Sequence, residues 1–308
     1  MARPGAAPKG SAVEMGAFFF IDDRLVNLDD PTAMVKDEHY ERFARREFAP
    51  FIRSEICALD MLYAVADMRD GHYVERLSLR GGLSVRSVVP LADHRFSFDA
   101  DFSPNTPGGF TYRHVGDLKS DMMRYGTTKG CKTRVRVTTN DAKLFFMEVG
   151  YRKSLGPNHG IIEPPKIEVC KTCRVLKEPV LGPVETIIDL DILGLDPPKI
   201  AHLSLEEQLA TKLFVIGSSG RQRNHFDAYD SFRILKHNEP DMRRTRDIFK
   251  ELCGRHKSRP SVYASECRRQ LDAMRKNSKK RASLEETAFA DEFDFNAMVA
   301  TVNSFYDF

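Results

Sequence analysis

Two aspartates that alternate with apolar residues are the part of the sequence that most clearly indicates chemistry. Asp99 and Asp101 lie in the segment Phe-Asp-Ala-Asp-Phe, and residues two apart on a β-strand point to the same face. Two such carboxylates can hold a divalent cation, because Mg²⁺ and Mn²⁺ prefer oxygen ligands. These ions neutralise the attacked phosphate and the leaving pyrophosphate in nucleotidyl transfer. The pair therefore indicates a nucleotidyltransferase with Mg²⁺ or Mn²⁺ as cofactor and a nucleoside triphosphate as substrate.

A glycine pair upstream of the aspartates supplies a place for phosphate. Gly81 and Gly82 follow a strand-like run, and without a Cβ the backbone can approach a phosphate closely. Arg95 and Ser97 lie between the glycines and the aspartates. Because a guanidinium can bind phosphate as a bidentate fork, we expect these four residues to bind the nucleotide.

The sequence leaves open which residue supplies a third carboxylate from a neighbouring strand. Glu168 in the segment Lys-Ile-Glu-Val-Cys is the preferred catalytic residue and metal ligand. Glu148 is an alternative, and so are Asp189 and Asp191, where the alternating pattern recurs without a glycine turn ahead of it. A strand with two surface aspartates also explains that second copy.

A lysine on an expected helix could reach the same cleft. Ser204 and Glu207 form a capping box that predicts a helix over 205–216. Lys212 shares one face of that helix with apolar residues, so it either extends out of the packing or points toward the triphosphate. We expect the second arrangement.

Two aspartates on the next helix could orient that lysine. Asp227 and Asp230 are three residues apart within an expected helix over 225–237, so they lie on one side of it. We expect Asp227 to be catalytic and Asp230 to contact the nucleotide, or both to orient Lys212 or an arginine.

The expected elements divide the chain into three parts. A helix over 51–68 is followed by strands over 73–79, 95–102, 133–139, 143–149, 166–170 and 186–193, with a short helix over 83–89. The helices over 205–216 and 225–237 come next, and a second capping box at Ser283 predicts a last helix toward Phe305. This order predicts a loose tail over 1–35, an α/β lobe over 36–200 and an α-helical lobe over 201–308.

Composition narrows the class of protein. The 308 residues carry a formal net charge of +3, but residues 241–281 hold 14 Lys and Arg against 5 Asp and Glu. Such a stretch is either a solvated helical face or a contact for nucleic acid. No apolar run approaches the roughly 20 residues that a membrane span needs. We therefore expect a cytoplasmic protein without membrane contact, with its six cysteines as reduced thiols.

Three separated blocks resemble the AbiEii/AbiGii-type toxins, which are nucleotidyltransferase-like proteins of bacterial toxin–antitoxin and phage-abortive systems. The first block contains Ile-Arg-Ser-Glu at 52–55, Leu-Arg-Gly-Gly at 79–82 and Arg-Phe-Ser-Phe-Asp-Ala-Asp at 95–101. The second block is the segment 166–170. The third block is the segment 205–212 together with Asp-Ala-Tyr-Asp at 227–230. Together they span about residues 52–235, whereas the last 70 or so residues resemble nothing further.

This resemblance implies an α+β fold with a polymerase-β-like nucleotidyltransferase lobe, a mixed sheet with flanking helices, followed by the helical lobe. It implies that Gly82, Asp99, Asp101, Lys212 and Asp227 match the family's functional positions. A nucleotidyl group would pass from NTP to an acceptor with release of pyrophosphate. In some relatives that acceptor is the 3′ end of tRNA, and a cognate antitoxin is expected from a neighbouring gene.

The sequence departs from the family pattern at two positions. Leu83 stands where the family usually has threonine, and Phe226 stands where an arginine commonly precedes the first aspartate of D-x-x-D. Two other functions therefore stay open. One is a non-catalytic RNA-binding or interaction module with a degenerate site, carried by the basic stretch; the other is a small-molecule nucleotidyltransferase.

Overall fold

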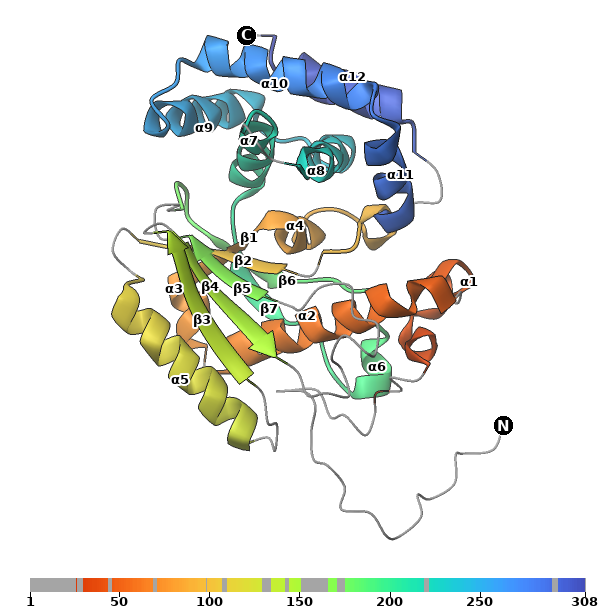
Figure 1. Ribbon diagram of the computed structural model, residues 1–308, viewed down its shortest axis with the longest axis vertical. Coiled ribbons are helices and arrows are strands. Elements are labelled where there is room, and N and C mark those ends of the chain that lie inside the picture. The colour runs from red at the N-terminus through yellow and green to blue at the C-terminus, as the bar shows by residue number, and fades with distance from the viewer. Residues whose placement is uncertain are drawn as a thin grey trace.

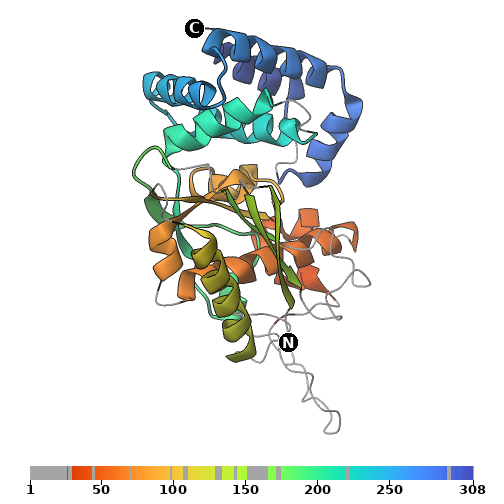
Figure 2. The ribbon, with the colours of Figure 1, turned by 60° about the vertical axis from the view of Figure 1, so that its left-hand side comes forward.

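A computed structural model describes residues 26, 30–43, 46–68, 71–97, 99–106, 110–128, 134–141, 144–150, 166–170, 175–218, 222–289 and 293–307. Its strands all belong to the N-terminal part of the chain, and the C-terminal helices form a separate layer next to the sheet (Figure 1). The fold is therefore α+β, as the sequence predicts, and the view in Figure 2 shows the same separation into a sheet-containing part and a helical part.

One mixed sheet contains the seven strands of the described residues, in the order β3-β4-β5-β2-β1-β7-β6. The strands are β1 Leu77–Arg80, β2 Asp99–Pro104, β3 Arg134–Asp141, β4 Leu144–Gly150, β5 Lys166–Cys170, β6 Val180–Pro183 and β7 Lys199–His202. Only the pairs β1–β7 and β2–β5 are parallel. The hairpin of β3 and β4 and the strand β5 confirm the predictions for 133–149 and 166–170.

Helices cover one face of this sheet. The described helices of the N-terminal part are α1 Asp37–Phe43, α2 Ala49–Asp67, α3 His72–Arg76, α4 Gly81–Ser84, α5 Tyr112–Thr128 and α6 Leu190–Leu193. Apolar side chains of α2 and α5 form one core with Leu79, Ala100, Phe102, Ile167 and Val169 of the strands. Because side chains alternate along a strand, the polar residues of β2 and β5 face the opposite side.

That opposite side carries the helical part of the chain. Its helices are α7 Leu205–Ile216, α8 Asn224–His237, α9 Met242–Arg255, α10 Pro260–Arg275, α11 Ser278–Thr287 and α12 Phe295–Ser304. They share a second apolar core, which Val85 and Val89 enter from the segment after α4. No described helix is both long and apolar enough to cross a bilayer. The two cores therefore meet around the glycine turn that the sequence singled out.

The capping predictions are partly wrong. Ser204 Oγ accepts from the Glu207 amide at 3.4 Å, as expected, but the Glu207 carboxylate binds the amides of Leu176 and Lys177 at 2.8 and 3.0 Å. The predicted helix start at Ser283 is wrong, because Ser283 lies inside α11 and separate caps begin α11 and α12. Glu207 thus anchors a distant loop instead of closing its own helix.

Two further expectations differ from the structure. The strand expected over 73–79 begins only at Leu77, after the short helix α3. The strand expected over 186–193 is replaced by a turn and α6, and Asp189 caps that helix by accepting from the Asp191 amide at 3.1 Å. Asp189 and Asp191 therefore do not lie on a strand.

Cysteine chemistry differs from the prediction at one position. Cys57, Cys253 and Cys267 are buried free thiols, but Cys170 is disulfide-bonded. Cys131 and Cys173 lie outside the described residues. The expectation of reduced thiols throughout is therefore wrong at Cys170.

Candidate active site

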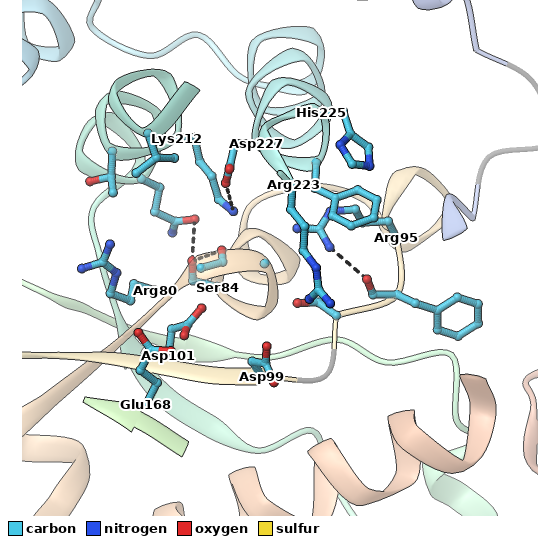
Figure 3. A pocket seen from close by; sticks show the side chains of 18 of the residues that line it. Arg80, Ser84, Arg95, Asp99, Asp101, Glu168, Lys212, Arg223, His225 and Asp227 are labelled. Atoms are coloured by element: carbon cyan, nitrogen blue, oxygen red, sulfur yellow. Dashed lines mark hydrogen bonds and ion pairs between the residues drawn. The ribbon is translucent and has the colours of Figure 1, made fainter. Parts of the chain in front are cut away.

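The strand register brings the predicted carboxylates together. In β2, Asp101 lies opposite Arg80 of β1 on one side and Glu168 of β5 on the other. Asp99 lies two residues earlier on the same strand, and Figure 3 shows all three carboxylates below α7 and α8. Glu148 lies on β4, one strand farther from β2, and its side chain is outside the described residues.

Crowding of these carboxylates changes the acidity of Asp101. Its pKa is raised to about 7 by burial and by the neighbouring charges of Glu168 and Asp99, against the opposing charges of Arg80 and Lys212. A divalent cation would relieve this repulsion, and its preference for oxygen ligands fits the three carboxylates. Among the described residues, no three Asp, Glu, His or Cys side chains lie close enough together to hold a metal ion without moving.

Both glycines of the turn are required by the atoms packed against them. Gly81 has φ +76°, and a Cβ there would collide with the carboxylate of Asp101. A Cβ on Gly82 would collide with Ser97 and lie 2.8 Å from Arg95 Nη2. The turn therefore holds Asp101 on one side and the Arg95 and Ser97 side chains on the other.

The fork of Arg95 engages a carboxylate. Arg95 Nε and Nη2 donate to the two oxygens of Asp230 at 2.9 and 2.8 Å, and Nη1 donates to the Phe96 carbonyl at 2.9 Å. The guanidinium also lies over the Phe226 ring, 4.6 Å from its centroid. The edge of the Arg95 guanidinium that we expected to bind the triphosphate therefore already binds Asp230 of α8.

Lys212 belongs to the same buried network. Its Nζ donates to Asp230 Oδ2 at 2.6 Å and to Asp227 Oδ1 at 3.3 Å. Burial raises the pKa of Asp230, but the charges of Arg95 and Lys212 outweigh it, so the net pKa lies below its usual value. Asp230 stays ionised and joins the loop before β2 to α7 and α8.

A second buried ion pair supports this loop from behind. Both terminal nitrogens of Arg86, just after the glycine turn, donate to Glu55 of α2, and Arg86 Nη2 also donates to the Arg95 carbonyl at 3.3 Å. Thr186 Oγ1 donates to Glu55 Oε1 at 3.0 Å. Glu55, part of the first family-like block, is therefore structural.

The predicted site residues surround one cavity of about 640 Å³ (Figure 3). Nine of them line it: Gly81, Gly82, Arg95, Ser97, Asp99, Asp101, Glu168, Lys212 and Asp227. Asp230 is only 3% exposed and lies behind Arg95 and Lys212. Asp189 and Asp191 are not among the lining residues.

The cavity also contains polar residues outside the predicted set. Arg223 extends from the start of α8 toward Asp99 (Figure 3). Ser84 Oγ donates to the Gly81 carbonyl at 3.1 Å and to Gln208 Oε1 at 3.4 Å. Gln208 lies four residues before Lys212, so the helical spacing could have identified it. Arg80 directly precedes the glycines and could have been identified from that position.

Comparison with known proteins gives the same assignment as the geometry. Residues 64–305 match the family described as nucleotidyl transferase AbiEii toxin, type IV toxin–antitoxin system. The fold is similar to that of MenT4, a nucleotidyltransferase toxin from Mycobacterium tuberculosis, with a TM-score of 0.59, 16% sequence identity and 85% of each chain covered. No curated protein matches the sequence. The chain belongs to the AbiEii family of nucleotidyltransferase toxins of toxin–antitoxin systems.

Proposed function

We propose that this toxin is metal-dependent and transfers a nucleotidyl group from NTP to the 3′ end of an RNA acceptor, with tRNA as the acceptor in the cell. The observation that carries the proposal is the placement of Asp99, Asp101 and Glu168 across one cavity from Lys212 and Arg223. Carboxylates on one wall and cations on the other suit a metal-bound triphosphate.

The three carboxylates are assigned to the metal. Asp99, Asp101 and Glu168 would hold Mg²⁺ or Mn²⁺, which when bound neutralises charge on the attacked and leaving phosphates. The raised pKa of Asp101 supports this assignment, since a carboxylate that is costly to ionise alone is stabilised by a nearby cation.

The cations that face the carboxylates are assigned to the triphosphate. Arg80 and Arg223 line the cavity on two sides of the carboxylates, and Lys212 faces them from α7 (Figure 3). We assign Arg95 and Asp230 an indirect role, because their bidentate pair fixes the Gly82 turn and the Lys212 ammonium. Asp227 keeps Lys212 directed at the cavity.

The reaction then follows from positioning and electrostatics. The acceptor hydroxyl oxygen attacks the α-phosphorus in line with the bond to the β-phosphate. The new P–O bond forms as that bond breaks, and pyrophosphate leaves with the electron pair. The proton of the hydroxyl passes to the carboxylate of Glu168, which acts as general base. Lys212 Nζ compensates the charge that develops on pyrophosphate.

Modification of the tRNA 3′ end would block aminoacylation and so stop growth. We infer that an antitoxin from a neighbouring gene counteracts this activity, as the family assignment suggests, and that the protein acts in the cytoplasm, where tRNA is aminoacylated.

A labelling assay tests the proposal. Wild type, Asp99→Asn and the control Asp191→Asn, an exposed aspartate away from the cavity, would each be incubated with total tRNA, Mg²⁺ and one of four α-labelled NTPs. We expect label in tRNA from wild type and the control but not from Asp99→Asn. Equal labelling by all three proteins would refute the metal assignment.

A second candidate function rests on a neighbouring cavity. This cavity of about 730 Å³ shares Phe51 with the active-site cavity. Five glutamates and one arginine line it: Glu38, Glu41, Arg42, Glu47, Glu285 and Glu286. An acidic surface beside the site favours a cationic acceptor, such as a small amine with hydroxyl groups. Label in a low-molecular-weight product instead of tRNA would support this alternative.

A further inference from the structure

The basic stretch predicted over 241–281 is divided by the structure into two kinds of surface. On α9 and α10 several cations pair with carboxylates: Lys250 with Asp247 at 3.6 Å, Arg255 with Glu251 at 2.7 Å, Arg269 with Glu266 at 2.5 Å, and Arg268 with Asp307. Paired surface charges offer little attraction to a distant polyanion, because each opposite charge cancels the field of its partner. The surface around these four ion pairs is a solvated helical face.

The junction of α10 and α11 differs. We call Arg275, Lys276, Lys279, Lys280 and Arg281 the α11 corner. The first three of these residues are exposed and the last two are half-buried. No Asp or Glu occurs between residues 273 and 284, and among the described ion pairs none involves a residue of the corner. Five positive charges therefore remain uncompensated on one short surface.

The α11 corner is attached to the rim of the active-site cavity. Lys280 Nζ donates to Asn224 Oδ1 at the start of α8, directly after the cavity residue Arg223. One turn later, Ser283 Oγ lies 3.4 Å from His225 Nε2, and both residues line the cavity. Figures 1 and 2 show α11 running from the end of α10 down to the sheet-containing part. The helix therefore leads from the basic corner to the site.

The other end of α11 has the opposite charge. Glu285 and Glu286 line the acidic cavity together with Glu38 and Glu41 of α1. A polyanion is attracted to the first half of α11 and repelled from its second half. The change of sign falls at the level of Ser283, where the helix borders the active site.

We propose that the α11 corner binds the phosphate backbone of the RNA acceptor and directs its 3′ end past Ser283 into the active-site cavity. This inference rests on the proposed function, since it assumes an RNA acceptor. The observations favour RNA over an acidic protein, because the regularly spaced phosphates of a nucleic-acid backbone suit cations that lie along one helix and the turn before it.

Binding measurements with matched variants test the inference. The corner variant is Lys276→Gln/Lys279→Gln, and the control is Arg243→Gln/Arg244→Gln, which also removes two exposed cations but on α9. A 5′-fluorescein-labelled 20-nucleotide RNA would be titrated at several salt concentrations. Each phosphate contact contributes about 0.7 to the slope of log affinity against log salt. The corner variant should therefore lose about 1.4 in slope and bind roughly 25-fold more weakly at 0.1 M salt.

The outcomes separate this inference from the function on which it rests. We expect a loss of less than about twofold in the control and unchanged thermal melting in both variants. Equal losses in the two variants, while wild type still labels RNA, would overturn the corner alone. Wild type that neither binds nor labels RNA would overturn the RNA acceptor as well. Corner-dependent binding of polyglutamate but not RNA would assign the surface to an acidic protein partner and overturn the inference.

Discussion

Replacing Asp101 by asparagine should abolish activity and yet stabilise the metal-free protein. The pKa of Asp101 rises from 3.8 to about 7 on folding, first because of burial and then because of Glu168 and Asp99. Between these values the folded protein binds more protons than the unfolded chain, so stability falls as pH increases. Asparagine resembles the neutral acid in shape and does not pay this cost.

The magnitude follows from the shift. Each pKa unit corresponds to 1.36 kcal/mol, so the rise from 3.8 to about 7 destabilises wild type by about 4 kcal/mol above pH 7. Asp101→Asn should therefore unfold at a temperature about 6 °C higher than wild type at pH 8 in EDTA. The difference should shrink steadily below pH 7 and vanish near pH 4.

The assay is thermal unfolding of both proteins from pH 4 to pH 8, with and without Mg²⁺. Added Mg²⁺ should raise the melting temperature of wild type at pH 8 more than that of Asp101→Asn, because the variant lacks one of the assigned ligands. A melting-temperature difference that does not change with pH, or a variant that is less stable at pH 8, would refute the reasoning.

Three further predictions concern the same site. Gly82→Ala should reduce nucleotidyl transfer by at least about tenfold, because the added Cβ would displace Arg95. The control Gly116→Ala on α5, where nothing lies within 4 Å of an added Cβ, should preserve activity and stabilise the protein by about 1 kcal/mol. Steady-state kinetics and thermal melting of both variants check these expectations. Asp230→Asn should lower the free energy of unfolding by about 3–5 kcal/mol, because it leaves two buried cations without their shared carboxylate. Urea unfolding measures this, and Asp227→Asn should cost less, because its contact with Lys212 is longer, at 3.3 Å against 2.6 Å for Asp230. EDTA should abolish transfer and Mg²⁺ should restore it; transfer that persists in EDTA would contradict the metal assignment.

Local patterns explain which parts of the site the sequence could predict. The alternation around Asp99 and Asp101 identified β2, and Glu168 was found because its neighbours Ile167 and Val169 read as a buried face. The same logic failed at Asp189, because an aspartate that caps a short helix leaves the same local pattern as an aspartate on a strand. Period two alone does not separate these structures.

The sequence predicted the pairings between distant residues only in part: Asp230 does bind Lys212 and an arginine, one of the arrangements left open, but which arginine it binds was not predicted. The carboxylate of Glu207 binds amides 30 and 31 residues earlier, and the Arg95 fork binds Asp230, 135 residues later. Both residues had a plausible local role, a capping box for Glu207 and phosphate binding for Arg95. Nothing in their immediate neighbours indicates the partner that the folded chain brings to them.

The same long separation between Arg95 and Asp230 bears on how the toxin is made. A ribosome that adds about 5–20 residues per second needs roughly 7–27 s to synthesise the 135 residues between them. During that interval the nascent chain acquires β2 with Asp99 and Asp101 but lacks the carboxylate that fixes Arg95 and Lys212. We therefore expect a partly synthesised chain to be inactive until translation has passed α8, so that an antitoxin is needed only from that point on.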